Sequence, residues 1–325
     1  MPPPLIALEE HFLATAIAED GLDKYSEQLK HVPGMMDKLL DLSDLRISQM
    51  DEGNVAIQVI SHCAGAKTVA QCIKANNQLA TAIMQHPDRF AGFATLDVEN
   101  PRAAAEELRR CITDLQFTGA LIDNHTPDAT YLDGPEYDVL WSTGQELDVP
   151  IYIHPTWASD VALQAHYTGP SISTAASISI AHSAFGWHSD TATSFLRLFA
   201  AGVFERFPRL KIILGHFGEM IPFMLERICN LSRRWSVGFT RNFETVWREN
   251  VWVTTAGVWG VAPMATLLRN TSVDRIMFSV DYPFASSADG LKWWTELEQS
   301  GLLDEEGLRK IAFGNAERLL GLKAR

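Results

Sequence analysis

Short apolar segments alternate with longer amphipathic segments along the whole chain of 325 residues. Apolar runs of about four to eight residues are typical of buried strands, and apolar positions three and four apart are typical of helices. Repeated strand and helix units of this kind predict a parallel sheet covered by helices. The predicted strands are Leu5–His11, Val55–Ser61, Phe90–Leu96, Gly119–Asn124, Pro150–His154, Lys211–His216, Val251–Thr255 and Arg275–Val280.

The predicted helices each carry one apolar stripe. Pro101–Leu115 begins with a proline, which is favoured in a first helical turn, and keeps apolar residues at helical spacing. Thr191–Phe207 has a wider stripe of aromatic and aliphatic side chains, which suits packing on a sheet. No linker, charge block or repeat interrupts the alternation. We therefore predict an α/β fold in which residues 1–325 form a single (β/α)8 TIM barrel.

Two connections are longer than the others and are expected to shape the active site. Leu13–Leu42 follows the first predicted strand, and Thr156–Asp190 follows the fifth. The second of these is rich in Ser, Ala, Gly and His and has Phe185 and Trp187 near its end. Long insertions after barrel strands lie at the C-terminal rim, where the active sites of such barrels are found.

Charge and composition exclude several classes of partner. The formal net charge is −13, from 27 basic against 40 acidic residues, so no global positive field exists to attract nucleic acid or acidic lipid. An anionic substrate would need a local positive centre instead. No apolar run reaches the ~18 residues of a membrane helix, and the first residues lack the pattern of a signal peptide. We expect a cytoplasmic protein that binds neither nucleic acid nor membranes. The cysteines, at positions 63, 72, 111 and 229, have no paired spacing and are expected to be reduced thiols.

Polar residues at the ends of several predicted strands are the candidates for chemistry. Glu9 and His11 are two residues apart on a strand, so their side chains leave the same face, whereas Glu10 points the other way. His154 and Asp281 end two other strands. Together these side chains would supply a mixed oxygen and nitrogen shell for one divalent cation, with Zn²⁺ or Mn²⁺ expected.

Four motifs that span nearly the whole chain carry a resemblance to a known family. They are Ala-Leu-Glu-Glu-His-Phe at 7–12, Val-Pro-Ile-Tyr-Ile-His-Pro at 149–155, Phe-Pro-Arg-Leu-Lys-Ile-Ile-Leu-Gly-His-Phe-Gly-Glu at 207–219 and Phe-Ser-Val-Asp-Tyr-Pro-Phe at 278–284. In this order the chain resembles the decarboxylase branch of the amidohydrolase superfamily, which includes γ-resorcylate, 2,3-dihydroxybenzoate and salicylate decarboxylases. The resemblance implies that the four candidate ligands named above hold one metal ion.

The resemblance also implies roles for residues next to the metal. His216 and Glu219 are expected to lie beside it as a charge-coupled pair, and Arg227 is expected to meet the substrate carboxylate near a subunit boundary. Hydrolytic members usually begin with His-x-His and often have a bridging lysine on the fourth strand. Here the motif is Glu-x-His, and residues 117–124 contain no lysine. One metal is therefore expected, which leaves His216 available for proton transfer.

Further substrate contacts are predicted around this centre. Trp187 aligns with an aromatic position of the relatives and is expected either to stack on the substrate ring or to fill the core. His62 and His125 follow the second and fourth strands, and Asn124 ends the fourth; these side chains are expected to line the pocket. The histidines of the long connections and helices, His188 among them, are expected to lie away from the chemistry. A homodimer or homotetramer is implied, because related barrels pair through the helices after strands five and six.

The predicted reaction is non-oxidative decarboxylation of a small aromatic carboxylic acid. An ortho-hydroxybenzoate could chelate one metal through its carboxylate and hydroxyl oxygens. Asp281 is the predicted general acid for the ring carbon, and His216, oriented by Glu219, would handle the phenolic proton. Two alternatives stay open at this point: a metal-dependent lactone or ester hydrolase, and a metal-binding structural protein without activity.

Overall fold

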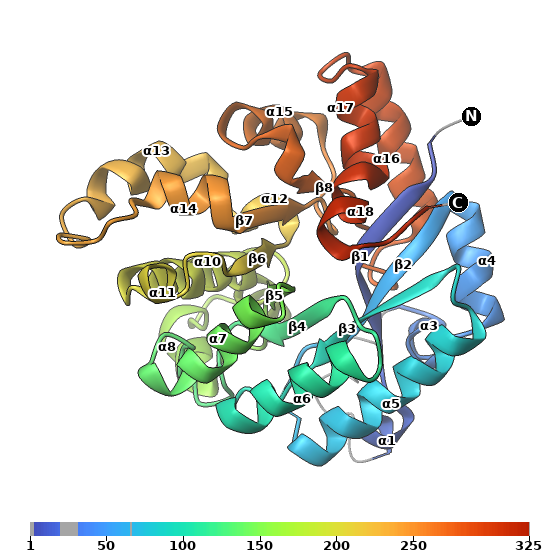
Figure 1. The fold of residues 1–325 in the computed structure, drawn as a ribbon, viewed down its shortest axis with the longest axis horizontal. Helices are drawn as coiled ribbons and strands as arrows, with labels where there is room; N and C mark the ends of the chain where they lie inside the picture. The colour runs from blue at the N-terminus through green and yellow to red at the C-terminus, as the bar shows by residue number, and fades with distance from the viewer. Residues whose placement is uncertain (1–2, 20–31, 66, 325) are drawn as a thin grey trace.

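Eight parallel strands in chain order form the centre of the computed structural model, which describes residues 3–19, 32–65 and 67–324 (Figure 1). Helices lie between consecutive strands and surround them, as a (β/α)8 TIM barrel requires. All eight predicted strands are present. Their bounds are β1 Leu5–Phe12, β2 Val55–His62, β3 Phe90–Thr95, β4 Gly119–Asp123, β5 Pro150–His154, β6 Lys211–Leu214, β7 Val251–Thr254 and β8 Ile276–Met277.

The barrel closes through the segment that follows β8. The predicted last strand was too long, since β8 pairs with β7 only at Ile276 and Met277. Beyond it, the backbone N–H of Asp281 donates to the Glu9 carbonyl at 2.9 Å, and Glu10 forms a parallel bridge with Tyr282. The first and last strands of the chain are therefore joined at the C-terminal end of the barrel, where Glu9 and Asp281 lie.

The strands are apolar on both faces because both faces are covered. One set of buried side chains fills the inside of the barrel, and a larger set lies between the strands and the surrounding helices. The inner set is Ile6, Leu8, Ile57, Val59, Ala91, Phe93, Leu121, Tyr152, Ile213, Met277, Ala316 and Leu320. With the interior filled in this way, open space for a ligand is left only toward the strand ends.

The helices follow the strands in the expected order. In the first half they are α1 Thr15–Ala18, α3 Met35–Leu40, α4 Asp44–Glu52, α5 Val69–Gln85, α6 Pro101–Thr113, α7 Asp138–Glu146, α8 Asp160–His166 and α9 Thr174–Ala181. In the second half they are α10 Gly186–Ala200, α11 Val203–Arg206, α12 His216–Glu219, α13 Ile221–Ser232, α14 Phe243–Asn250, α15 Val261–Asn270, α16 Ser287–Gln299, α17 Glu305–Arg309 and α18 Asn315–Leu320. None of the helices in the described ranges is both long enough and apolar enough to span a bilayer.

Two predicted features of the helices and connections are refined. The helix predicted over Thr191–Phe207 is two helices, because Gly202 takes a left-handed conformation with φ 72° between α10 and α11. The long connection after β5 is ordered as α8, α9 and the start of α10, with Ser159 and Ser173 capping the first two. In the connection after β1, residues 20–31 lie outside the described residues, and α1 and α3 flank them. Within the described residues, the cysteines form no disulfide.

Candidate active site

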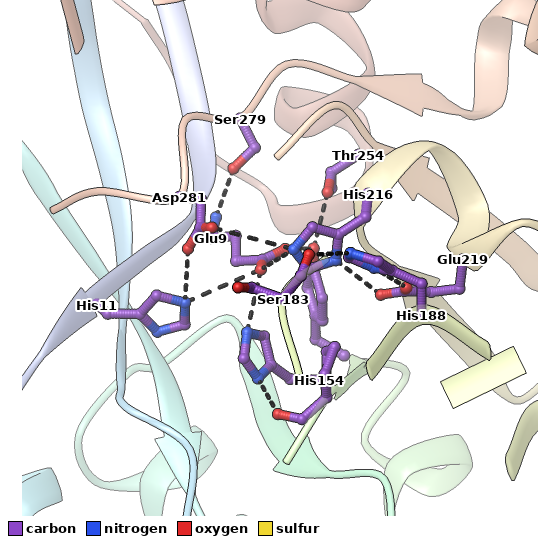
Figure 2. Close-up of polar contacts among 12 residues, drawn as sticks. Glu9, His11, His154, Ser183, His188, His216, Glu219, Thr254, Ser279 and Asp281 are labelled. Atoms are coloured by element: carbon purple, nitrogen blue, oxygen red, sulfur yellow. Dashed lines mark hydrogen bonds and ion pairs between the residues drawn. The ribbon is translucent and has the colours of Figure 1, made fainter. Parts of the chain in front are cut away.

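The predicted metal ligands converge at the C-terminal end of the barrel (Figure 2). His11, His154 and Asp281 line a cavity of about 300 Å³, and Glu9 lies fully buried at its floor. The strands position these groups. Glu9 is held by its backbone N–H, which donates to the Ser279 hydroxyl at 2.7 Å, and His154 is the last residue of β5.

Distances place the ligand atoms around one point. The Glu9 Oε1 atom is 3.1 Å from the His154 Nε2 atom and 3.9 Å from the His11 Nε2 atom. The His11 Nε2 atom is 3.3 Å from Asp281 Oδ1. His216 adds a fifth group, with its Nε2 atom 3.4 Å from Glu9 Oε1. Two carboxylates and three imidazoles therefore face one another across a few ångströms.

The hydrogen bonds of these groups are incomplete without a cation. The His154 Nδ1–H donates to the Pro155 carbonyl at 2.6 Å, so in the neutral ring Nε2 is a lone pair that faces the Glu9 carboxylate. Within the described residues, the buried atoms Glu9 Oε1 and His11 Nε2 have no hydrogen-bond partner. Unpaired acceptors aimed at one point are the arrangement that a divalent cation satisfies. Glu9, His11, His154 and Asp281 thus fit a single divalent metal.

The pKa values of these groups reflect the negative charge that the carboxylates concentrate in the metal-free site. Burial alone would lower the pKa of His11, but Asp281 and Glu9 raise it to about 9. Burial alone would raise the pKa of Glu9, but the neighbouring imidazoles, His216 first, hold it well below its usual value. In the absence of metal, the His11 imidazole therefore binds protons more tightly than free histidine does. A divalent cation would replace them, and its affinity would increase with pH for that reason.

A second polar group lies beside the ligands, around the fully buried carboxylate of Glu219. The structure brings Glu219 to His216 as the sequence predicted, with His216 Nδ1 donating to Glu219 Oε1 at 2.7 Å. The other oxygen, Oε2, receives the Nδ1–H of His188 at 2.8 Å. Burial opposes charge on His216, but Glu9 and Glu219 raise its pKa to about 10. His188 was expected to lie away from the chemistry, so this contact corrects that expectation.

Tyr152 is a further member of the site that sequence reasoning missed. Its hydroxyl donates to Glu9 Oε2 and lies 2.7 Å from the Thr254 hydroxyl. Tyr152 is two residues before His154 on β5, so the alternation of a strand places both side chains on the inner face. That spacing was the signal by which the sequence could have identified it.

Apolar and aromatic side chains form the walls of the cavity. Trp187 lies on one side next to Trp157, with 5.5 Å between the ring centroids. The structure therefore brings Trp187 to the cavity as predicted. The remaining apolar lining is formed by Val32, Met35, Cys63, Ala64, Phe284 and Ala285. A polar floor and apolar walls suit a flat ring that carries its charged group at one end.

Three predicted substrate contacts are placed elsewhere by the structure. The His62 Nε2 atom accepts the backbone N–H of Ala14 at 3.0 Å, and its Nδ1–H donates to the Cys63 carbonyl. Burial holds the pKa of His62 well below its usual value, so the ring is a neutral framework residue. Asn124 donates to Asp190 and accepts the backbone N–H of Thr156, which ties β4 to the connection after β5. Neither side chain lines the cavity. His62 is the last residue of β2 and lies on the outer face, opposite Ile57 and Val59, whereas Asn124 follows the last pair of β4. His125 pairs with Asp190 and is likewise outside the cavity lining.

Arg227 is also outside the cavity of the single chain. It lies on the exposed side of α13, and the described cavity lining does not include it. Contact with a substrate in the same chain is therefore not supported. Its predicted role requires a second copy of the chain.

Comparison with known proteins identifies the class that this fold and site define. The amidohydrolase family model matches residues 10–322, and the chain belongs to that family. It is 49% identical over 326 residues to decarboxylase orsB of Emericella nidulans, with 98% of each chain covered. It is 33% identical over 342 residues to the γ-resorcylate decarboxylase of Polaromonas sp., again with 98% of each covered.

A solved structure gives the same result. The dihydroxybenzoic acid decarboxylase of Polaromonas sp. JS666, determined with bound manganese and the inhibitor 2-nitroresorcinol, superimposes with a TM-score of 0.84. The sequence identity is 31%, and the match covers 99% of this chain and 98% of the other. The predicted resemblance to the decarboxylase branch is confirmed.

Proposed function

We propose that this protein is a metal-dependent, non-oxidative decarboxylase that converts an ortho-hydroxybenzoate into the corresponding phenol and CO2. The observation that carries the proposal is the convergence of Glu9, His11, His154 and Asp281 within a few ångströms of one another. All but Glu9 line a cavity whose other walls are largely apolar. Relatives that are named as aromatic acid decarboxylases support it along nearly the full length of the chain.

The metal is proposed to be Mn²⁺ or Zn²⁺, one ion per chain. Manganese in the related decarboxylase structure and the mixed oxygen and nitrogen donors support this choice. When bound by these residues, the cation would supply a Lewis acid for a substrate that carries a carboxylate and an ortho hydroxyl group. Around it, Tyr152 and the Ser279 hydroxyl keep Glu9 in place through its side chain and its backbone.

The protein side chains carry the proton transfers. In the proposed step the bond between the ring and the carboxylate carbon breaks, and its electron pair stays on the ring carbon. Asp281 lines the cavity and delivers a proton to that carbon. His216 presents Nε2 to the cavity because Glu219 engages its Nδ1–H, so Nε2 is the atom that exchanges the phenolic proton.

The cavity favours a single substituted ring. Its volume of about 300 Å³ is at the small end of the range for ligand pockets. Trp187 offers an aromatic edge or face to the ring, while Met35 and Ala64 line another part of the wall. These apolar residues support a dihydroxybenzoate or an alkyl salicylate as the substrate.

A homodimer or homotetramer is proposed to complete the site. The exposed side of α13 carries Phe223, of which 80% is accessible, together with Met224, and Val237 beyond the helix is 83% accessible. Large exposed apolar side chains of this kind favour a subunit interface. Arg227 lies on the same helix, so pairing through α13 would allow it to reach the carboxylate of a substrate in the partner copy. A cytoplasmic location stays a prediction.

The reaction type is tested with metal-replete protein and a panel of ortho-hydroxybenzoates in deuterium oxide. The expected result is a phenol with one deuteron at the former carboxyl carbon, together with CO2, measured by mass spectrometry. Asp281→Asn is expected to reduce turnover by at least ~100-fold because a positioned acid is lost, with metal content measured in the same sample. If simple lactones or esters are hydrolysed and no ortho-hydroxybenzoate loses CO2, the protein is a hydrolase of the same fold.

A further inference from the structure

One buried carboxylate bridges two imidazole rings at the edge of the cavity (Figure 2). The two oxygens of Glu219 are divided between His216 and His188, at 2.7 Å and 2.8 Å from the respective Nδ1 atoms. The ring centroids of the two histidines are 4.6 Å apart. His188 comes from α10, whereas His216 and Glu219 follow β6, so the contact joins two separate elements of the barrel.

The backbone that carries His216 and Glu219 is strained. Residues 216–220 all have positive φ, with His216 at 47° and Glu219 at 52°. Non-glycine residues in this region cost free energy and persist only when the surroundings hold them in place. The turn does not hold the Glu219 side chain by itself. The hydrogen bond from His188 comes from outside the turn and engages the Glu219 oxygen that His216 does not use.

The orientation of His216 depends on that carboxylate. With its Nδ1–H donated to Glu219 Oε1, the Nε2 atom of the neutral ring is free to accept a proton on the cavity side. A Glu219 side chain that rotated away would leave both tautomers of His216 available. The His188 Nε2 atom lies 3.2 Å from the Ser183 carbonyl, a second hydrogen bond that only the protonated ring can donate together with the one to Glu219.

We propose that His188 is a positioning residue for the decarboxylation. Its Nδ1–H anchors Glu219, Glu219 in turn selects the Nδ1–H tautomer of His216, and His216 Nε2 then meets the substrate. The expected effect on kcat rests on the proposed function. The two hydrogen bonds that link His188 to Glu219 and Glu219 to His216 do not depend on it.

Removal of the His188 imidazole should leave the helix in place. The helix α10 is anchored by Phe195, Leu198 and Phe199, which are all buried. It is also tied to β4 through the Ser194 hydroxyl, which donates to the Asn124 carbonyl at 2.8 Å. These contacts do not involve His188. A change in activity after its substitution would therefore reflect the site and not the loss of a helix.

The test compares two substitutions of similar size in metal-loaded protein. His188→Leu fills the space without a donor, and His188→Asn keeps an N–H near the position of Nδ1. The Leu variant is expected to lose ~10–100-fold in kcat, the scale for removing a partner that orients an active-site imidazole or carboxylate. Its KM and metal content should change little, and the pH profile of its kcat should shift. The Asn variant should recover most of the loss. Thr193→Ala, at an exposed position of the same helix, should match the unmodified protein.

A second measurement does not depend on turnover. In zinc-loaded protein with ¹⁵N-labelled histidine, NMR should show His216 protonated at Nδ1, and the Leu variant should show a mixture of tautomers. If the Leu variant keeps the unmodified kcat, pH profile and tautomer, or if Asn is as impaired as Leu, the proposal is wrong. Should the Leu variant fail to fold, His188→Ala takes its place. If the protein decarboxylates no ortho-hydroxybenzoate, the proposed function fails, and the tautomer measurement alone decides the role of His188.

Discussion

Two clusters of histidine, carboxylate and tyrosine lie at the same end of the barrel and differ in how their polar atoms are paired. The Glu9 cluster consists of the four proposed metal ligands with Tyr152 and His216. The Asp190 cluster consists of Asn124, His125, Tyr131 and Asp190. In the Asp190 cluster the carboxylate receives three donors, and the His125 Nδ1–H donates to the Thr126 carbonyl at 2.6 Å. In the Glu9 cluster two buried atoms have no hydrogen-bond partner within the described residues.

The difference shows that residue type does not distinguish a metal site from a structural network. Both clusters contain the same kinds of side chain, although Asp190 comes from α10 and Tyr131 from the connection after β4. In the Asp190 cluster the charges balance, because Asp190 raises the pKa of His125 against the effect of burial, and His125 lowers that of Asp190. In the Glu9 cluster the lone pairs face one another. What marks the metal site is the hydrogen-bonding capacity that the protein leaves unused.

The largest expected effect comes from removing one histidine of each cluster. His154→Ala should reduce metal content far below one ion per chain and abolish turnover, because a ligand is lost. His125→Ala should keep its metal, because His125 bonds only to protein groups that need no cation. Metal is measured by mass spectrometry after dialysis. Full retention of metal in His154→Ala would remove His154 from the ligand set, and loss of metal in His125→Ala would end the contrast between the clusters.

A smaller effect is expected on stability. Asp190→Asn replaces one carboxylate oxygen by an NH2 group that cannot accept, so either Tyr131 or the pair Asn124 and His125 loses its acceptor. The loss should cost on the order of 1–3 kcal/mol of the free energy of unfolding. For a chain of this size, this corresponds to a decrease of several degrees in Tm, measured by calorimetry. Asp148→Asn is the matched control, because Asp148 is 75% exposed and pairs only with Lys211 at the surface. Equal Tm values for the two variants would show that the Asp190 cluster contributes no more than a surface ion pair.

The smallest expected effect is a pH dependence of the Tm difference between the unmodified protein and Asp190→Asn. The pKa of folded His125 is raised above 6.5, so its contribution to stability is complete below about pH 6.5 and is lost as the pH rises through the folded pKa. The pKa of folded Asp190 is lowered below 3.8, so its contribution is complete above about pH 3.8 and is lost as the pH falls through the folded pKa. The Tm difference between the unmodified protein and Asp190→Asn should be largest between these limits. A difference that grows steadily up to pH 9 would contradict the assignment.

The sequence predicted the parts of this molecule that follow from regular alternation. Eight apolar runs gave eight strands, and the two-residue spacing of Glu9 and His11 placed both side chains inside the barrel. Prediction was weaker where alternation stops. Phe278–Val280 was assigned to the last strand because it is apolar, but these residues bond to other partners: the Phe278 N–H donates to the Ile311 carbonyl, and the Val280 N–H donates to the Glu10 carboxylate.

Contacts between distant elements were beyond prediction for a physical reason. His188 is on a helix, and its partner Glu219 is 31 residues further along in a turn with positive φ, so no local pattern connects them. Asn124 was misplaced because a residue just past a strand is free to turn toward either face. Alternation from Ile57 and Val59 would have placed His62 on the outer face. The predicted substrate contact of Arg227 would need a second copy of the chain, which a single sequence does not place.

The closure of the barrel has a consequence for how the protein is made. Glu9 and Asp281 belong to the same ligand set, and the Asp281 N–H donates to the Glu9 carbonyl, although they stand near opposite ends of the chain. During synthesis on a ribosome, Glu9, His11 and His154 emerge long before Asp281. No truncated product that ends before residue 281 can hold the full set, so tight metal binding would report that translation has passed this point.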